Sequence, residues 1–116
     1  MDDKTRTTLR FLREAAIKAA GTNIRDPHAS PLEGYCASVS VIVRGILGGD
    51  LVTGKIDNCR HYWNRLPSGE EVDLTSCQFG GDGLNPLKKG RKTKSPELTD
   101  FGTICFGQLM LEYLRE

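Results

Sequence analysis

The sequence feature that most constrains the fold is a predicted β-hairpin at Leu66-Pro67-Ser68-Gly69-Glu70. Proline favours the φ of about −65° that the first central position of a type I turn requires, and glycine accepts the left-handed conformation that follows. This pattern is typical of a three-residue hairpin loop with a bulge, which we place at 67–69. It therefore predicts two antiparallel strands, at about 59–66 and 70–76.

The predicted register decides which side chains share a face of the hairpin. With 67–69 as the loop, His61 lies opposite Thr75, and Asp73 lies opposite Trp63. Because side chains alternate along a strand, these four residues share one face. His61 and Asp73 are then diagonal neighbours at about 7–8 Å, a separation that the two side chains can bridge with a hydrogen bond. The opposite face is predicted to be apolar and to pack against the core: Tyr62, Leu66, Val72 and Leu74.

One helix is predicted before the hairpin, near the N-terminus. Asp2 or Asp3 is suited to cap its first turn, and Gly21 is suited to the position after its last turn. Apolar residues recur between them at spacings of three and four: Leu9, Leu12, Ala16 and Ala19 or Ala20. Residues 22–34 are rich in Gly, Asn, Pro and Ser, so we expect a loop there that is long enough for a functional role.

Two more helices and one strand complete the expected elements. A helix begins near Tyr35 and ends at Gly48-Gly49. Its core-facing stripe is Val39, Ile42, Val43, Ile46 and Leu47. A strand is predicted at about 51–56, and the segment 77–103, rich in Gly, Pro and Lys, is predicted to be a long surface loop. The last helix, at about 103–115, carries the stripe Phe106, Leu109, Met110, Tyr113 and Leu114.

Length and composition favour a single α+β domain. The chain has 116 residues, of which 38% are hydrophobic and 27% charged, enough for one ordinary core. No apolar run approaches the roughly 18 residues of a membrane-spanning helix. We therefore expect one soluble domain over 1–116, in which N- and C-terminal helices accompany a small antiparallel sheet and no part contacts a membrane.

The N-terminal residues and the cysteines predict a cytoplasmic protein. Met1-Asp2-Asp3-Lys4 is charged, and no apolar stretch with a small-residue cleavage site follows it. The four cysteines, at 36, 59, 77 and 105, include no CxxC pair, and an unexported protein keeps such thiols reduced. A disulfide framework is therefore not predicted.

Three residues point to thiol chemistry. Cys36 lies in the first turn of the second predicted helix, where unpaired N–H groups and the positive end of the helix dipole favour a thiolate. A thiolate, a histidine and an aspartate that holds the histidine supply a nucleophile, a general acid/base and an orienting group. The predicted catalytic triad is therefore Cys36, His61 and Asp73, in that chain order.

Each member of this triad also has a simpler interpretation. Free cysteine is among the most buried residue types, so a cysteine at a helix start usually packs in the core. A histidine in a hairpin more often forms a structural hydrogen bond, and an aspartate on a strand is usually solvated. The coincidence of all three, with two of them on one face of the hairpin, favours the catalytic interpretation.

Several motifs resemble the YunG-like family of small bacterial proteins. They are Gly34-Tyr35-Cys36-Ala37, Gly48-Gly49, Ile56, the run from His61 to Gly69, Val72-Asp73-Leu74-Thr75 and Gln78-Phe79. More distantly, the order of a helix-borne Cys, His-x-Trp and Asp-x-Thr is similar to that of transglutaminase-like enzymes of the papain fold. The resemblance implies a papain-like fold in which Cys36 matches the nucleophile, His61 the base and Asp73 the orienting residue.

Together these features predict a cysteine-dependent acyl-transfer enzyme, either an amide hydrolase such as a cysteine protease or a transglutaminase-type enzyme. We expect a protein or peptide substrate and no cofactor. The Cys36 backbone N–H is the first expected oxyanion-hole donor, and a group from 22–35 is expected to be the second. The predicted substrate or oxyanion environment consists of Tyr35, Trp63, Asn64, Thr75 and Gln78.

A zinc site is the first alternative. It would combine Cys36, Cys59, His61 and Cys77. Structural zinc sites usually contain a closely spaced ligand pair such as CxxC, which this sequence lacks. No metal is therefore predicted.

A non-catalytic binding module of the same fold is the second alternative. The net charge is only +1, but 84–95 contains five basic residues and no acidic one: Lys88, Lys89, Arg91, Lys92 and Lys94. Such a basic loop would contact an acidic partner or nucleic acid. Nucleic acid is the less favoured partner, because the segment has no interleaved aromatic residues on which bases could stack.

Overall fold

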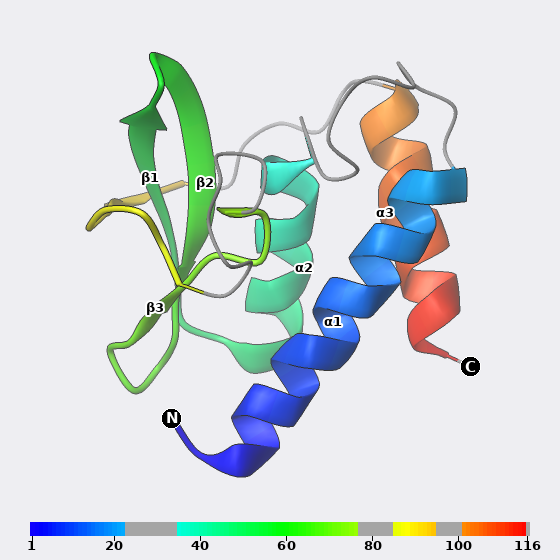
Figure 1. The fold of residues 1–116 in the computed structure, drawn as a ribbon, viewed down its shortest axis with the longest axis horizontal. Helices are drawn as coiled ribbons and strands as arrows, with labels where there is room; N and C mark the ends of the chain where they lie inside the picture. The colour runs from blue at the N-terminus through cyan, green and yellow to red at the C-terminus, as the bar shows by residue number, and fades with distance from the viewer. Residues whose placement is uncertain (23–34, 77–84, 95–100, 116) are drawn as a thin grey trace.

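The computed structural model describes residues 1–22, 35–76, 85–94 and 101–115. Within them the chain forms α1 (Asp3–Thr22), α2 (Cys36–Leu47), β1 (Asp50–Ile56), β2 (Cys59–Arg65), β3 (Glu71–Val72), β4 (Arg91–Thr93) and α3 (Phe101–Leu114). The strands make one antiparallel sheet in the order β3-β2-β1-β4. The helices lie on one side of it: α2 packs on β1 and β2, and α1 runs beside α3 (Figure 1). The predicted α+β class is confirmed.

The helix boundaries follow from local chemistry. The Asp2 carboxylate accepts the Thr5 N–H at 2.7 Å, so Asp2 is the N-cap of α1. The helix continues through Gly21 to Thr22, and the prediction that Gly21 follows its last turn is wrong. Gly48 ends α2 with a φ of 77°, and its N–H donates to the Arg44 carbonyl.

The hairpin between β2 and β3 has the predicted loop and register. Gly69 has a φ of 93°, and the Leu66 N–H donates to the Glu70 carbonyl at 2.7 Å. Asn64 pairs with Val72. However, β3 ends at Val72, so the strand predicted to reach 76 is wrong. The Asp73 carboxylate accepts the Thr75 N–H at 3.0 Å, and this local turn replaces the strand ladder.

The segment predicted as a surface loop at 77–103 contains a strand. Residues Arg91–Thr93 form β4 and pair antiparallel with β1, so that Thr53 lies opposite Arg91. The prediction missed β4 because its partner lies about forty residues earlier in the chain, and a three-residue run has no visible periodicity. The predicted loop at 22–34 lies outside the described residues, apart from Thr22, which ends α1.

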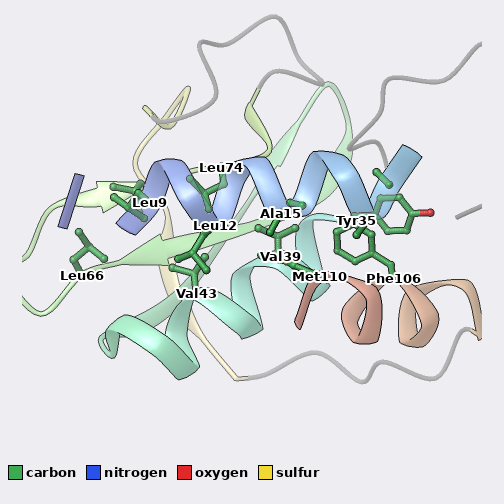
Figure 2. Packing of buried hydrophobic residues seen from close by; sticks show 14 residues of the cluster. Leu9, Leu12, Ala15, Tyr35, Val39, Val43, Leu66, Leu74, Phe106 and Met110 are labelled. Carbon is green, nitrogen blue, oxygen red and sulfur yellow. The ribbon is translucent and has the colours of Figure 1, made fainter. Parts of the chain in front are cut away.

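The core lies between the helices and the inner face of the hairpin. Its cluster includes Leu9 and Leu12 of α1, Val39 and Val43 of α2, and Leu66, Val72 and Leu74 of the hairpin segment, together with Phe106 and Met110 of α3 (Figure 2). The predicted apolar stripes are therefore mostly confirmed. Two residues are exceptions. Ile46 is 48% exposed in the last turn of α2, and Tyr62 of β2, predicted to pack against the core, is half-buried and lies outside the core cluster. Periodicity locates the face of a helix, but not the point at which the elements packed against it end.

No helix within the described ranges has both the length and the apolar character needed to cross a membrane.

Candidate functional site

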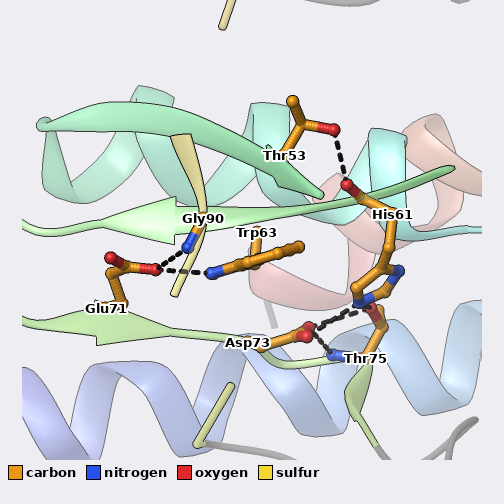
Figure 3. Close-up of polar contacts among 7 residues, drawn as sticks. All are labelled: Thr53, His61, Trp63, Glu71, Asp73, Thr75 and Gly90. Carbon is orange, nitrogen blue, oxygen red and sulfur yellow. Dashed lines mark hydrogen bonds and ion pairs between the residues drawn. The ribbon is translucent and has the colours of Figure 1, made fainter. Parts of the chain in front are cut away.

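Three separate elements bring the candidate triad together. Cys36 is the first residue of α2, His61 lies in β2, and Asp73 follows directly after β3. Because the 67–69 loop folds β3 back along β2, Asp73 reaches the imidazole from the neighbouring chain segment (Figure 3). The side chains of His61 and Asp73 are completely buried, whereas Cys36 is half-buried.

The predicted hydrogen bond between His61 and Asp73 is present. His61 Nε2 lies 2.7 Å from Asp73 Oδ2. Since a carboxylate only accepts, the imidazole donates its Nε2–H to Asp73. Nδ1 is then the ring nitrogen left to face the thiol.

Thr75 fixes the carboxylate that holds the imidazole. Its backbone N–H and its hydroxyl both donate to Asp73 Oδ1, at 3.0 and 3.1 Å. The same hydroxyl oxygen lies 3.4 Å from His61 Nε2. Asp73 therefore receives three hydrogen bonds from two residues, which satisfies a buried charge and allows it one orientation.

The imidazole also contacts the candidate nucleophile. Burial of the ring lowers the pKa of His61, but hydrogen bonds and electrostatic interactions with Asp73 and Cys36 outweigh burial and raise it to about 9. The balance of these effects favours the protonated imidazole at neutral pH.

A second hydrogen-bond network, which the sequence analysis missed, holds Trp63 beside the imidazole of His61. Trp63 lies beside His61 with a ring-centroid distance of 5.5 Å. Glu71 accepts the Trp63 Nε1–H at 2.8 Å and the Gly90 N–H at 3.0 Å, and it pairs with Arg65 (Figure 3). Burial raises the pKa of Glu71, but these hydrogen bonds and the Arg65 charge lower it overall. The register that follows from the 67–69 loop pairs Arg65 with Glu71. This pair of opposite charges was the sequence signal that could have indicated the network.

The remaining predicted site residues have different environments. Thr75 and Trp63 lie in the triad's surroundings as described above. Tyr35 is buried in the core, where its ring stacks on that of Phe106 with a distance of 4.0 Å between the ring centroids. Asn64 lies on the opposite face of β2 from His61 and donates to the Ser40 carbonyl of α2, so it ties the sheet to the helix. Gln78 lies outside the described residues.

Of the cysteines proposed as zinc ligands, Cys36 contacts His61, but the described residues show no metal-binding cluster around this pair. Cys59 is exposed and free, and Cys36 and Cys105 are free and half-buried. Cys77 lies outside the described residues. Among the residues that the structure does describe, no group of three or more His, Cys, Asp or Glu side chains is arranged to hold a metal ion.

Comparison with known proteins gives one clear relationship. The model of the YunG protein family matches residues 12–104, which is well over half of the chain and includes Cys36, His61 and Asp73. No curated protein and no solved structure matches the chain. The chain therefore belongs to the YunG protein family.

Proposed function

We propose that this protein is a cysteine-dependent acyl-transfer enzyme in which Cys36 is the nucleophile, His61 the general acid/base and Asp73 the group that orients the imidazole. The observation that carries the proposal is the chain of contacts from Asp73 through His61 to Cys36, with a distance of 2.7 Å at its first link. The buried, hydrogen-bonded carboxylate fixes Nε2, so that Nδ1 can exchange a proton with the thiol.

The reaction follows from these roles. The Cys36 thiolate attacks the carbonyl carbon of an amide, and a carbon–sulfur bond forms as the carbonyl oxygen becomes an oxyanion. The imidazolium of His61 then gives its proton to the leaving amine as the carbon–nitrogen bond breaks, which leaves a thioester on Cys36. Water or a second amine then attacks the thioester carbon and gives a proton to His61. The carbon–sulfur bond breaks, which releases the acyl group as an acid or a new amide and restores the Cys36 thiolate.

The position of Cys36 suits this chemistry. The first N–H groups of a helix have no intrahelical acceptor, and the helix dipole places partial positive charge at that end. As the first residue of α2, Cys36 contributes its own N–H to this group of unpaired donors. That N–H is the donor we assign to the developing oxyanion.

We infer that the fold is the papain-like, transglutaminase-like one. The support is the sequence order of a cysteine at a helix start, a histidine on an antiparallel strand and an aspartate at the end of the next strand. The substrate class that we propose is a protein or peptide amide.

Trapping of the acyl-enzyme tests this function. An activated acetyl ester, p-nitrophenyl acetate, should transfer one acetyl group to Cys36, detected by intact mass and located by peptide mapping. Cys36→Ser should remove the adduct, and His61→Ala should slow its formation by at least about a hundredfold, the usual contribution of a general base. Cys59→Ser is the matched control, because Cys59 is exposed and lies outside the triad.

Equal acetylation of Cys36 and Cys59 in the native protein, or an unchanged rate in His61→Ala, would contradict the proposal. Either result would favour a non-catalytic binding module built on the same fold.

A further inference from the structure

Basic side chains line an open pocket at the outer edge of the sheet. The pocket has a volume of about 510 Å³. It lies beside the part of β1 that extends past Arg91, the first residue of β4. We call it the basic pocket, after its five cationic residues: Lys55, Arg60, Lys88, Lys89 and Arg91. Two of them, Lys55 and Arg60, belong to the β1–β2 hairpin and lie outside the basic segment that the sequence displays.

These five side chains are exposed, and none of them pairs with an acidic side chain among the residues that the structure describes. The ion pairs of neighbouring cations are formed elsewhere: Lys92 contacts Asp50 at 3.5 Å, and Arg65 contacts Glu71 at 3.2 Å. The positive charge of the basic pocket is therefore available to a ligand.

Hydrogen bonds hold one wall of the basic pocket, the segment from Lys88 to Arg91, in place. The Gly90 N–H donates to Glu71, and the Gly90 carbonyl accepts from Arg65 at 3.1 Å. The Lys88 amine donates to the Lys55 carbonyl at 3.1 Å, which joins the segment to β1. These bonds fix the chain between Lys88 and Arg91 against the hairpin, so that its cations are arranged before any ligand arrives.

We propose that the basic pocket binds a compact polyanion that carries phosphate groups. Five cations around a single pocket match several charges on a small ligand, and the volume lies within the usual range for small-molecule sites. An acidic peptide spreads its charges over a longer distance, at about 3.3 Å per extended residue. None of the described residues that line the pocket is aromatic, so they offer the bases of a nucleic acid no stacking partner.

The test is calorimetric titration of the whole protein with inorganic tripolyphosphate at physiological salt. The double variant Lys55→Ser/Arg60→Ser removes two charges from the pocket, and we expect it to weaken binding at least about tenfold. The matched control is Lys92→Ser/Lys94→Ser, which removes two exposed charges of the same segment outside the pocket. We expect less than about a threefold effect from it, because exposed charges at a distance are screened.

Three results would overturn the proposal. They are the absence of binding, an equal loss in both double variants, and tighter binding of a glutamate-rich peptide or a single-stranded oligonucleotide than of tripolyphosphate. Circular dichroism of each variant confirms that the fold is retained. The outcome is independent of the acyl-transfer proposal, because Cys36→Ser should bind tripolyphosphate as the native protein does.

Discussion

Asp73 raises the pKa of His61 through a hydrogen bond that is buried away from water. Because the carboxylate also accepts two hydrogen bonds from Thr75, its position does not depend on the histidine. An imidazole in this environment keeps its proton well above the usual pH range, since the pKa of His61 is about 9. The protonated ring is therefore the form that the folded protein stabilises.

This protonation predicts how stability depends on pH. In the unfolded chain His61 has its ordinary pKa of 6.5, and in the folded protein about 9. The stabilisation is thus fully present below pH 6.5 and is lost as the pH rises through about 9. Its size is about 3 kcal/mol, from 1.36 kcal/mol per pKa unit. Urea unfolding from pH 6.5 to 9.5 should show this decline, and Asp73→Asn should flatten it.

A free energy of unfolding that stays constant across this range in the native protein would contradict the protonation state assigned to His61.

At the scale of elements, local chemistry was predictable and distant pairing was not. The register of the hairpin follows from Pro67 and Gly69, because the turn that they favour leaves one way to pair the strands. The same sequence does not show that Asp73 ends β3, since its side chain can either accept local N–H groups or extend into solvent. Nor does it show that Gly90 lies against Trp63, a contact between residues far apart in the chain.

Substitution by alanine should have opposite effects on stability at Gly90 and at Gly45, because, of the two, only Gly90 lies close to other residues. A Cβ on Gly90 would lie 2.6 Å from the indole ring and 3.0 Å from Val52, so Gly90→Ala should destabilise the protein by about 1–3 kcal/mol. Gly45 lies within α2, where a Cβ meets nothing within 4 Å. Gly45→Ala should therefore stabilise by about 0.5–1 kcal/mol, the difference in helix propensity.

Urea unfolding of both variants measures these free energies. A Gly90→Ala protein as stable as the native one would show that the segment at Gly90 is not pinned against the sheet.

At the scale of the whole molecule, the candidate triad lies where the start of α2 meets the sheet. The helix packs on β1 and β2, while α1 and α3 close the core behind it (Figure 1). The chain order of Cys36, His61 and Asp73 was visible in the sequence, and so was the shared face of the last two. The position of Cys36 beside His61 was not, because it depends on how α2 packs against β2, partly through the bond from Asn64 to Ser40.

Activation of Cys36 by His61 can be measured by alkylation with iodoacetamide at pH 6, with each cysteine quantified by peptide mapping. Exposure alone favours Cys59, which is exposed, over Cys36, which is half-buried. If His61 activates Cys36, the order is reversed: Cys36 is alkylated faster than Cys59 and is slowed selectively by His61→Ala, because the imidazolium stabilises the reactive thiolate. Alkylation of Cys36 no faster than that of Cys59, or equally fast with and without His61, would contradict this activation.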